Sequence, residues 1–254
     1  MSYDKLNHLF AKLGEIDTPT ICNALELIDN EHRNFGYTDE VLFCLRPEMK
    51  PVVGIAKTAT CRSLRPSDRD SSTLKTDRVK YYTYINEGEF PKIVVMQDLD
   101  GGRRGHGPFW GEFNTRIHKA LGVCGVVTDN TVRDVPNLPD DIQILSHGFK
   151  PSHANIHIVE YNIQVNVASM VVTPGDIVHA DLHGAVSFPV EMAEDVIKKA
   201  QIFVDSEAPI LQACRDNPHL TLNEIIPTSL KDWRFTIHEY LRLFDDILRH
   251  FNRK

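Results

Sequence analysis

The chain has 254 residues, of which 42% are hydrophobic and 25% charged, as is typical of a globular protein with a substantial core. Its formal net charge of −7 argues against nucleic acid as the main ligand, because phosphate backbones require a basic surface. The five cysteines are widely spaced and include no C-x-x-C pair, which indicates reduced thiols and not a disulfide framework or a zinc ribbon.

The N-terminal stretch has no basic segment followed by an apolar one, so we expect no signal peptide. No run of residues approaches the roughly eighteen apolar residues that a membrane span needs. These two observations predict a cytoplasmic protein that has no membrane partner.

Apolar spacing predicts two helices within residues 3–29, and Asp17 ahead of Pro19 is a typical start for the second of them. Residues 30–50 are polar and irregular, which predicts no regular structure there. Residues 52–60 form an apolar run that is typical of a buried strand.

Residues 62–78 are rich in Arg, Ser and Asp without periodicity, which predicts an exposed loop. A short helix over residues 79–86 and a buried strand over residues 93–96 are expected next. The long loop over residues 98–111 is rich in glycine, but its spacing fits neither G-x-G-x-x-G nor a P-loop. We therefore expect this loop to form a flexible wall of a site and not a nucleotide cradle.

The stretch over residues 111–134 organises the predicted site. Apolar spacing predicts a helix over residues 114–121, and Gly122 is expected to end it because glycine readily takes a positive φ angle. Residues 125–127 then have the composition of a short buried strand. That strand would bring four polar side chains to its carboxyl end: Asp129, Asn130, Arg133 and Asp134.

Arg133 and Asp134 are residue types that suit a small anionic substrate. An arginine presents a planar fork of donors to a carboxylate, and an aspartate holds a divalent cation directly or through water. A helix that starts near Gly111 would add unpaired backbone amides, which favour an anion. Together these features predict chemistry on a 2-oxo acid. The alternative is that Arg133 and Asp134 form a structural ion pair where a strand meets a loop.

Strands dominate the second half of the chain. Apolar runs and alternating patterns predict them over residues 142–145, 156–159, 163–168, 171–172, 177–181 and 185–188. A helix over residues 191–203 follows, and no linker separates two domains, which favours one α/β domain. From Gln212 the chain continues as an extension with an amphipathic stripe over residues 237–251, which packs on its own domain or contacts another subunit.

Two groups of residues are candidate zinc sites. One contains His147, His153 and His157, and the other contains His179, Asp181 and His183. Neither group has a cysteine or a glutamate at supporting spacing, and strand histidines are more often hydrogen-bonded packing or surface residues. The sequence also lacks the G-x-S-x-G elbow of a serine hydrolase.

Two motifs resemble a known family. The first is V-x-D-x-x-V-R-D over residues 127–134, preceded by Gly111 and Glu112, and the second is P-G-D-x-V-x-A-D-x-x-G over residues 174–184. In this order and at this distance they resemble the RraA-like family, over roughly residues 15–210. That family includes class II pyruvate aldolases acting on 4-hydroxy-4-methyl-2-oxoglutarate, the regulators of ribonuclease E activity, and proteins once misnamed demethylmenaquinone methyltransferases.

The resemblance implies a compact α/β fold, a three-layer β/β/α sandwich over residues 1–211, with a C-terminal helical extension over residues 212–254. It also implies a homotrimer or a homohexamer that has active sites at its subunit interfaces. A small 2-oxo acid would be the substrate, and Mg²⁺ or Mn²⁺ would be the cofactor.

The resemblance also assigns roles to individual residues. Arg133 would bind the carboxylate and carbonyl side of the pyruvyl group, and Asp134 would hold the metal ion, largely through waters. Backbone amides for the carboxylate would come from Gly111, Glu112, Phe113 and Asn114. Glu207 would supply an acid to the neighbouring subunit's site.

The implied function is a divalent-metal-dependent lyase that cleaves a 4-hydroxy-2-oxo acid, or decarboxylates oxaloacetate, through a pyruvate enolate. The alternative is a non-catalytic protein that regulates a ribonuclease by binding it, and the acidic net charge is compatible with masking a basic surface. The presence of both Arg133 and Asp134 favours the enzyme.

The sequence departs from the family pattern at several positions. The departures are Asn23, Glu112 and His183, where aspartate is common, Asn130, where glycine is usual, and His147, where arginine is frequent. Arg133 and Asp134 are retained, so a catalytic site is expected, and the physiological substrate is left open.

Overall fold

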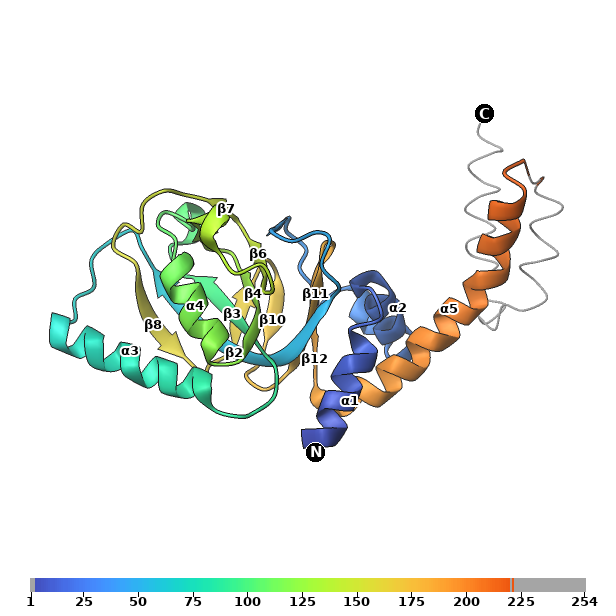
Figure 1. The fold of residues 1–254 in the computed structure, drawn as a ribbon, viewed down its shortest axis with the longest axis horizontal. Coiled ribbons are helices and arrows are strands. Elements are labelled where there is room, and N and C mark those ends of the chain that lie inside the picture. The colour runs from blue at the N-terminus through green and yellow to red at the C-terminus, as the bar shows by residue number, and fades with distance from the viewer. Residues whose placement is uncertain (1–2, 220, 222–254) are drawn as a thin grey trace. The chain divides into compact units, whose positions relative to one another are not determined.

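The computed structural model describes residues 3–219 and residue 221, and it combines helices with strands (Figure 1). The helices are α1 (Tyr3–Leu13), α2 (Thr18–Ile28), α3 (Ser71–Asn86), α4 (Glu112–Ala120) and α5 (Ala193–Asp216). The short 3-10 helices are η1 (Asn30–Arg33), η2 (Gly101–Arg103), η3 (Val135–Asn137) and η4 (Val190–Met192). None of the helices in this described part is long and apolar enough to cross a membrane.

Most strands belong to one mixed sheet. They are β1 (Phe43–Cys44), β2 (Val52–Arg62), β3 (Lys92–Asp98), β4 (Val123–Thr128), β6 (Gln143–Ser146), β8 (His157–Tyr161), β11 (Ile177–Asp181) and β12 (Gly184–Phe188). The strand order is β1-β6-β4-β3-β2-β11-β12, with β8 also paired to β2. β2, β3, β4 and β6 run parallel, and the remaining pairs are antiparallel. Two small sheets pair β9 (Val165–Val167) with β10 (Met170–Val172) and β5 (Thr131–Val132) with β7 (Gly148–Phe149).

Alternation along the central strands sorts their side chains into two faces. In β2, Val53 and Ile55 pack with α1 and α2, while Ala59 and Cys61 on the same face pack with α3. Ala56 points the other way, into a core that the β9–β10 hairpin covers. The nearly closed sheet therefore lies between helices and a hairpin, which confirms the predicted α/β fold.

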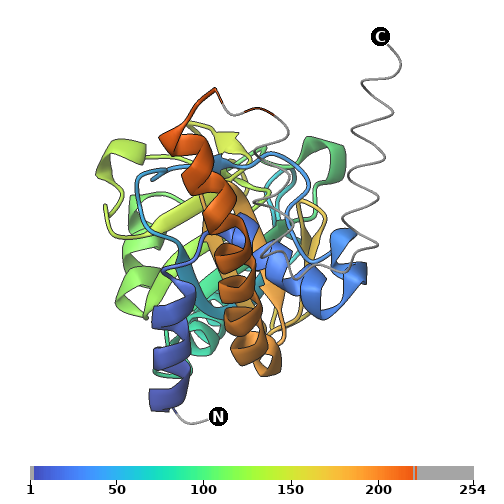
Figure 2. The same ribbon diagram turned by 90° about the vertical axis from the view of Figure 1, so that its right-hand side faces the viewer.

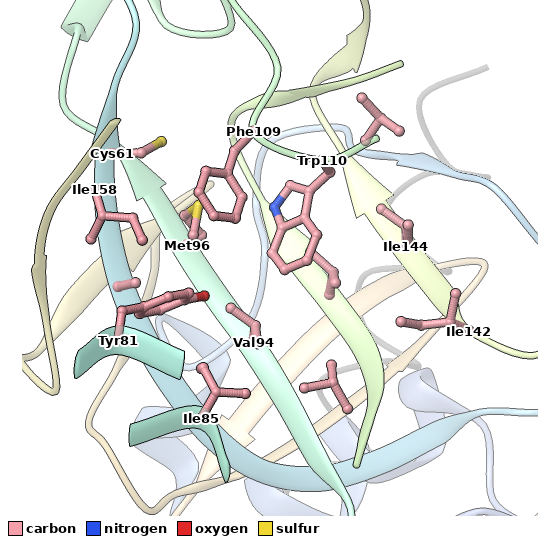
Figure 3. Close-up of a cluster of buried hydrophobic side chains, with 14 of the residues drawn as sticks. Cys61, Tyr81, Ile85, Val94, Met96, Phe109, Trp110, Ile142, Ile144 and Ile158 are labelled. Carbon is pink, nitrogen blue, oxygen red and sulfur yellow. The ribbon is translucent and has the colours of Figure 1, made fainter. Parts of the chain in front are cut away.

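The core beneath α3 holds the aromatic residues that precede α4 (Figure 3). Phe109 and Trp110 are both buried and meet at 74°, with ring centroids 5.3 Å apart. Tyr81 of α3 meets Phe109 edge-on, and Met96 of β3 belongs to the same cluster. This packing fixes the chain immediately before the start of α4.

The N-terminal helices are fixed to the sheet by a buried histidine of β11. The His179 Nδ1 atom lies 3.0 Å from the Thr18 hydroxyl, and its Nε2 atom lies 3.1 Å from the Leu13 carbonyl oxygen and 2.9 Å from that of Ile16. Because carbonyls only accept, Nε2 carries the proton and Nδ1 accepts from Thr18. Both ring nitrogens are thus engaged in structural bonds, and burial lowers the pKa of His179. Figure 2 shows α1 beside the first turns of α5, where Lys5 pairs with Glu194.

The predicted loop over residues 62–78 is wrong from Ser71 onward, because α3 begins there. The carboxylate of Asp70 caps this helix by accepting hydrogen bonds from the backbone amides of Ser72 at 2.8 Å and Thr73 at 2.9 Å. The first half of α3 is largely exposed and therefore lacks an apolar period. The helices predicted within residues 3–29 and the strands predicted in the first half of the chain are confirmed.

The chain divides into two compact units, Met1–Ala200 and Gln201–Lys254. α5 extends past its predicted end at residue 203, through Pro209, to Asp216. Side-chain bonds one helical turn apart support its second part, such as that from Gln201 to Asp205. The predicted domain boundary after residue 211 stays a prediction, and the predicted stripe over residues 237–251 lies outside the described residues.

A buried polar network holds the loop over residues 98–111 against the carboxyl ends of β3 and β4. The side-chain amide of Asn130 donates to Asp98 Oδ2 at 2.7 Å and to the Gly107 carbonyl at 3.2 Å. Its side-chain oxygen accepts from the Phe109 amide at 2.9 Å. Asp98 Oδ2 also accepts from the Gly105 amide at 2.7 Å. The predicted flexible wall is thus fastened at several points.

Asp129 lies beside this network with an unusual protonation equilibrium. Its side chain is buried, and it accepts a hydrogen bond from the Asp98 amide at 2.7 Å. Burial raises the pKa of Asp129 from 3.8 to about 7, the Asp98 amide opposes this, and the negative charge of Asp98 adds to it. The folded protein therefore keeps this carboxyl protonated at pH values where the unfolded chain releases the proton.

We predict that Asn130→Gly lowers the free energy of unfolding by about 3 kcal/mol, because it leaves buried partners of the amide unsatisfied. Chemical denaturation at neutral pH measures this. The matched control is Asn155→Gly, which removes an exposed asparagine side chain. Equal stability of the two variants would show that the hydrogen bonds of the Asn130 side chain do not stabilise the loop over residues 98–111.

We predict that Asp129→Asn makes stability less dependent on pH. A carboxyl whose folded pKa is raised favours folding at low pH, and this contribution is lost as pH rises from about 4 to about 7. The variant should therefore be more stable than the native protein at pH 8, with a difference that shrinks toward pH 4. Denaturant unfolding across this range tests it, and a constant difference would show that Asp129 does not titrate as described.

Candidate functional site

The segment after β4 presents Arg133 and Asp134 from a fixed backbone. The Arg133 amide donates to the Trp110 carbonyl at 2.9 Å, and the Lys150 amide donates to the Val132 carbonyl at 3.1 Å. Asp134 takes the left-handed conformation, with φ 57° and ψ 30°, which non-glycine residues adopt infrequently. The two consecutive side chains are therefore held in one arrangement where two chain segments meet.

Gly111 allows these side chains to lie against the start of α4. A Cβ atom at residue 111 would lie 2.8 Å from Asp134 Oδ2 and 2.9 Å from Arg133 Cγ, closer than carbon and oxygen atoms tolerate. Asp134 Oδ2 accepts from the Glu112 amide at 3.3 Å and lies 3.4 Å from Arg133 Nε. Both side chains are about one-third exposed, so they face solvent and each other. The structure thus brings together four of the predicted residues: Gly111, Glu112, Arg133 and Asp134.

The first turn of α4 offers backbone donors. Gly111 is its N-cap and has no side chain to bond the first amides, and the first intrahelical bond runs from the Thr115 amide to the Gly111 carbonyl at 3.0 Å. The Glu112 amide donates to Asp134 Oδ2. The amides of Phe113 and Asn114 have no acceptor within residues 3–219. Free amides at a helix start favour an anion.

A small pocket of about 170 Å³ opens beside these amides. Its lining residues are Arg78, Pro108, Phe109, Gly111, Phe113, Asn114, Arg133, His153 and Ile156. This volume is below the roughly 300–1,000 Å³ of pockets for drug-sized ligands, and so it suits a small acid and not a nucleotide. The predicted residues Gly111, Phe113, Asn114 and Arg133 line the pocket, whereas Asp134, whose Oδ2 atom lies beside Gly111, does not.

The side chain of Asn114 joins α4 to α3. Its amide donates to the Phe109 carbonyl at 2.6 Å, and its oxygen accepts from the Tyr82 hydroxyl at 3.1 Å. Arg78 Nη1 lies 3.4 Å from the same oxygen. The Asn114 side chain is therefore engaged in the structure, and only its backbone amide is open to a ligand.

A buried histidine reinforces the junction between α3 and α4. His118 Nδ1 donates to the Asn114 carbonyl at 2.7 Å, and Nε2 accepts from the Tyr81 hydroxyl at 2.8 Å. Burial lowers the pKa of His118 to about 4, the Asn114 carbonyl opposes this, and nearby Arg78 lowers it further. The ring is neutral at physiological pH and acts as a spacer, not as an acid.

Two of the polar residues that line the pocket, Arg78 and His153, were not predicted as substrate-binding groups. Arg78 lies in the segment that the sequence pattern assigned to a solvated loop, and the only signal for it was the Asp70 cap. His153 was a candidate zinc ligand, but its Nδ1 atom bonds the Ala154 carbonyl at 2.8 Å. No cluster of three or more metal-binding side chains occurs within residues 3–219 and 221.

Glu207, the predicted acid, lies on α5 in the second unit and is half-buried. Its role at a neighbouring site stays a prediction.

Two of the departures from the family pattern have hydrogen bonds within the fold. The Asn130 side chain holds the loop over residues 98–111 by donating to Asp98 and to the Gly107 carbonyl. His183 bonds Asp181 through its amide at 2.8 Å and its ring at 3.1 Å.

Several solved structures share the fold of this chain. An uncharacterized protein from Pseudomonas syringae pv. tomato superimposes with a TM-score of 0.67 at 22% identity, covering 87% of this chain and 94% of that one. RraAS2 of Streptomyces coelicolor, described as an unusual member of the RNase ES inhibitor RraA protein family, gives 0.62 at 23% identity, covering 79% and 94%. At these identities the likeness establishes the fold.

Sequence comparison gives a relative and a family. An uncharacterized protein of Methanocaldococcus jannaschii is 27% identical over 144 residues, which are 56% of this chain and 69% of that protein. The RraA-like family, described as Aldolase/RraA, matches residues 18–187, about two thirds of the chain. That match includes both motifs and every element that lines the pocket. The chain therefore belongs to the RraA-like family.

Proposed function

We propose that this protein is a divalent-metal-dependent lyase that releases pyruvate from a 4-hydroxy-2-oxo acid or from oxaloacetate. The family includes both metal-dependent aldolases and non-catalytic inhibitors of ribonuclease E, so membership alone does not choose between them. The observation that carries the proposal is the contact of Arg133 and Asp134 over Gly111, at the edge of a small cationic pocket.

The pocket is suited to the carboxylate of a 2-oxo acid. Arg133 would offer its guanidinium fork, and the amides of Phe113 and Asn114 would add donors from the start of α4. No acidic side chain lines the described pocket, so an incoming carboxylate meets no like charge there. Bound in this way, the acid would place its 2-oxo group on the side of Asp134.

The donor set of Asp134 fits a cation that keeps most of its waters. Its Oδ2 atom is engaged by the Glu112 amide, and within the described part of the chain no bond occupies Oδ1. Mg²⁺ is commonly bound through one or two carboxylates and several waters, and carboxylates also suit Mn²⁺. Asp134 would therefore hold the ion, which when bound would supply Lewis-acid polarisation of the 2-oxo group.

The residues of the site would then favour cleavage of the bond between carbons 3 and 4. As that bond breaks, negative charge grows on the oxygen at carbon 2, and the guanidinium of Arg133 would stabilise it in a fixed position. The Asp134 carboxylate would keep the guanidinium oriented through its contact with Nε. Glu207 of a neighbouring subunit would serve the proton transfer, in a homotrimer or a homohexamer.

We predict that Arg133→Gln and Asp134→Asn each lower kcat/KM for pyruvate release about a hundredfold or more, because each removes a group that acts on the developing charge. Oxaloacetate and 4-hydroxy-4-methyl-2-oxoglutarate are the substrates, with Mg²⁺ or Mn²⁺ and then with EDTA. Gly111→Ala should lower activity as well, since its methyl group displaces both side chains.

Arg116→Gln is the matched control, since it removes an exposed arginine of α4 outside the pocket and should leave kcat/KM within about twofold. If the folded native protein shows no metal-dependent release of pyruvate from either substrate, the proposed lyase activity is wrong. Binding of a ribonuclease by the inactive protein would then support the regulator.

A further inference from the structure

We infer that Arg78 is a second anion-binding group of the pocket and selects substrates that carry a second carboxylate. This inference rests on the proposed function and assigns the specificity of the same site. Arg78 belongs to α3, whereas Arg133 follows β5, yet both line the pocket of about 170 Å³. Two guanidinium groups from separate elements thus face one small cavity.

The surroundings of Arg78 leave its charge unbalanced. Its Nη1 atom lies 3.4 Å from both the Tyr82 hydroxyl and the Asn114 side-chain oxygen, and the guanidinium stacks over the Phe109 ring with 5.4 Å to the centroid. All these partners are neutral. No carboxylate among residues 3–219 and 221 pairs with it, and the adjacent Asp77 pairs with Arg69 instead, at 2.7 Å.

An unpaired charge of this kind is unfavourable when partly buried. Arg78 is half-buried, and guanidinium groups are permanently charged in proteins. A charge withdrawn from water needs an opposite charge or good hydrogen bonds, and the two bonds at 3.4 Å are long. A carboxylate in the pocket would supply the missing charge.

The groups that contact Arg78 are held in place before any ligand arrives. Asn114, which contacts Arg78, is itself fixed by its short bond to the Phe109 carbonyl, and His118 ties the same helix turn to Tyr81. Preorganised donors lose little conformational freedom on binding. Arg78 therefore lies among fixed neutral neighbours, as a specificity residue needs.

The two arginines can each bind one carboxylate of a dicarboxylate. In the proposed function Arg133 binds the carboxylate beside the 2-oxo group, near the start of α4. The far carboxylate of the same molecule would reach Arg78 in the same pocket, which Phe109 and Ile156 also line. A monocarboxylate of equal length would leave Arg78 unpaired, and hydrogen bonds to charged groups correspond to about tenfold to a hundredfold in affinity.

Calorimetry with two unreactive probes tests this inference. 2-Oxoglutarate and 2-oxovalerate have the same chain length and differ in the distal carboxylate, and neither has the 4-hydroxyl group that cleavage requires. With Mg²⁺ present, the native protein should bind 2-oxoglutarate about tenfold to a hundredfold more tightly. Arg78→Gln should abolish that preference and leave the affinity for 2-oxovalerate unchanged, and Arg78→Lys should restore part of it.

Lys80→Gln is the matched control, because it removes one positive charge from an exposed position of the same helix and should keep the preference. Arg133→Gln should weaken both probes together. The inference is overturned if the native protein has no preference, binds neither probe, or keeps the preference in Arg78→Gln. If the protein prefers 2-oxoglutarate through Arg78 but releases no pyruvate, the second anion-binding group is supported and the proposed lyase activity is wrong.

Discussion

The site depends on the close approach of two chain segments, one ending at Gly111 and the other at Asp134. Backbone pairing from the Arg133 amide to the Trp110 carbonyl brings them together, and the missing side chain at Gly111 lets them touch. The buried ring of Trp110 holds the first segment in the core, and the left-handed turn at Asp134 directs the second. Arg133 can therefore face the pocket only because a glycine stands opposite it.

A buried polar network of Asp98, Asp129 and Asn130 supports this close approach. Burying two neighbouring carboxyl groups is electrostatically unfavourable. Asp98 and Asp129 lie side by side, buried, at the ends of neighbouring parallel strands, with Asn130 between the loop and both strands. Backbone amides and the Asn130 side chain donate hydrogen bonds to these two side chains, and burial raises the pKa of Asp129 to about 7. The asparagine at a position where the family usually has glycine thus has a physical explanation in this chain.

Apolar patterns, together with residues that start or end helices, sufficed to predict much of the fold from the sequence. The apolar run of β2, the Asp17 cap and the end of α4 just before Gly122, which has a φ of 85°, all follow from local rules. The start of α3 did not, because its first half is exposed and only the Asp70 cap marks it. A signal carried by one side chain is weaker than an apolar period repeated over several turns.

The site was predictable to a similar degree and for the same kind of reason. Arg133 and Asp134 are adjacent in a recognisable motif that Gly111 precedes, so their meeting could be anticipated. Arg78 and the Asn114 side chain were not anticipated, because their contact joins α3 to α4 across 36 residues of chain and no local pattern records it. His118 was hidden in the same way, since its partner Tyr81 lies in another helix.

The charge of the whole chain and the charge of the pocket have opposite signs. A net charge of −7 would repel small acids at long range, but salt screens exposed charges beyond about 8–10 Å. Inside the pocket two arginines and the start of a helix act at short range, with no acidic side chain among the described lining residues. A surface meant only to mask a basic partner has no need of such a pocket, whereas an enzyme for small acids needs one. The local arrangement of charge, and not the net charge, is therefore the feature on which the proposal of an enzyme rests.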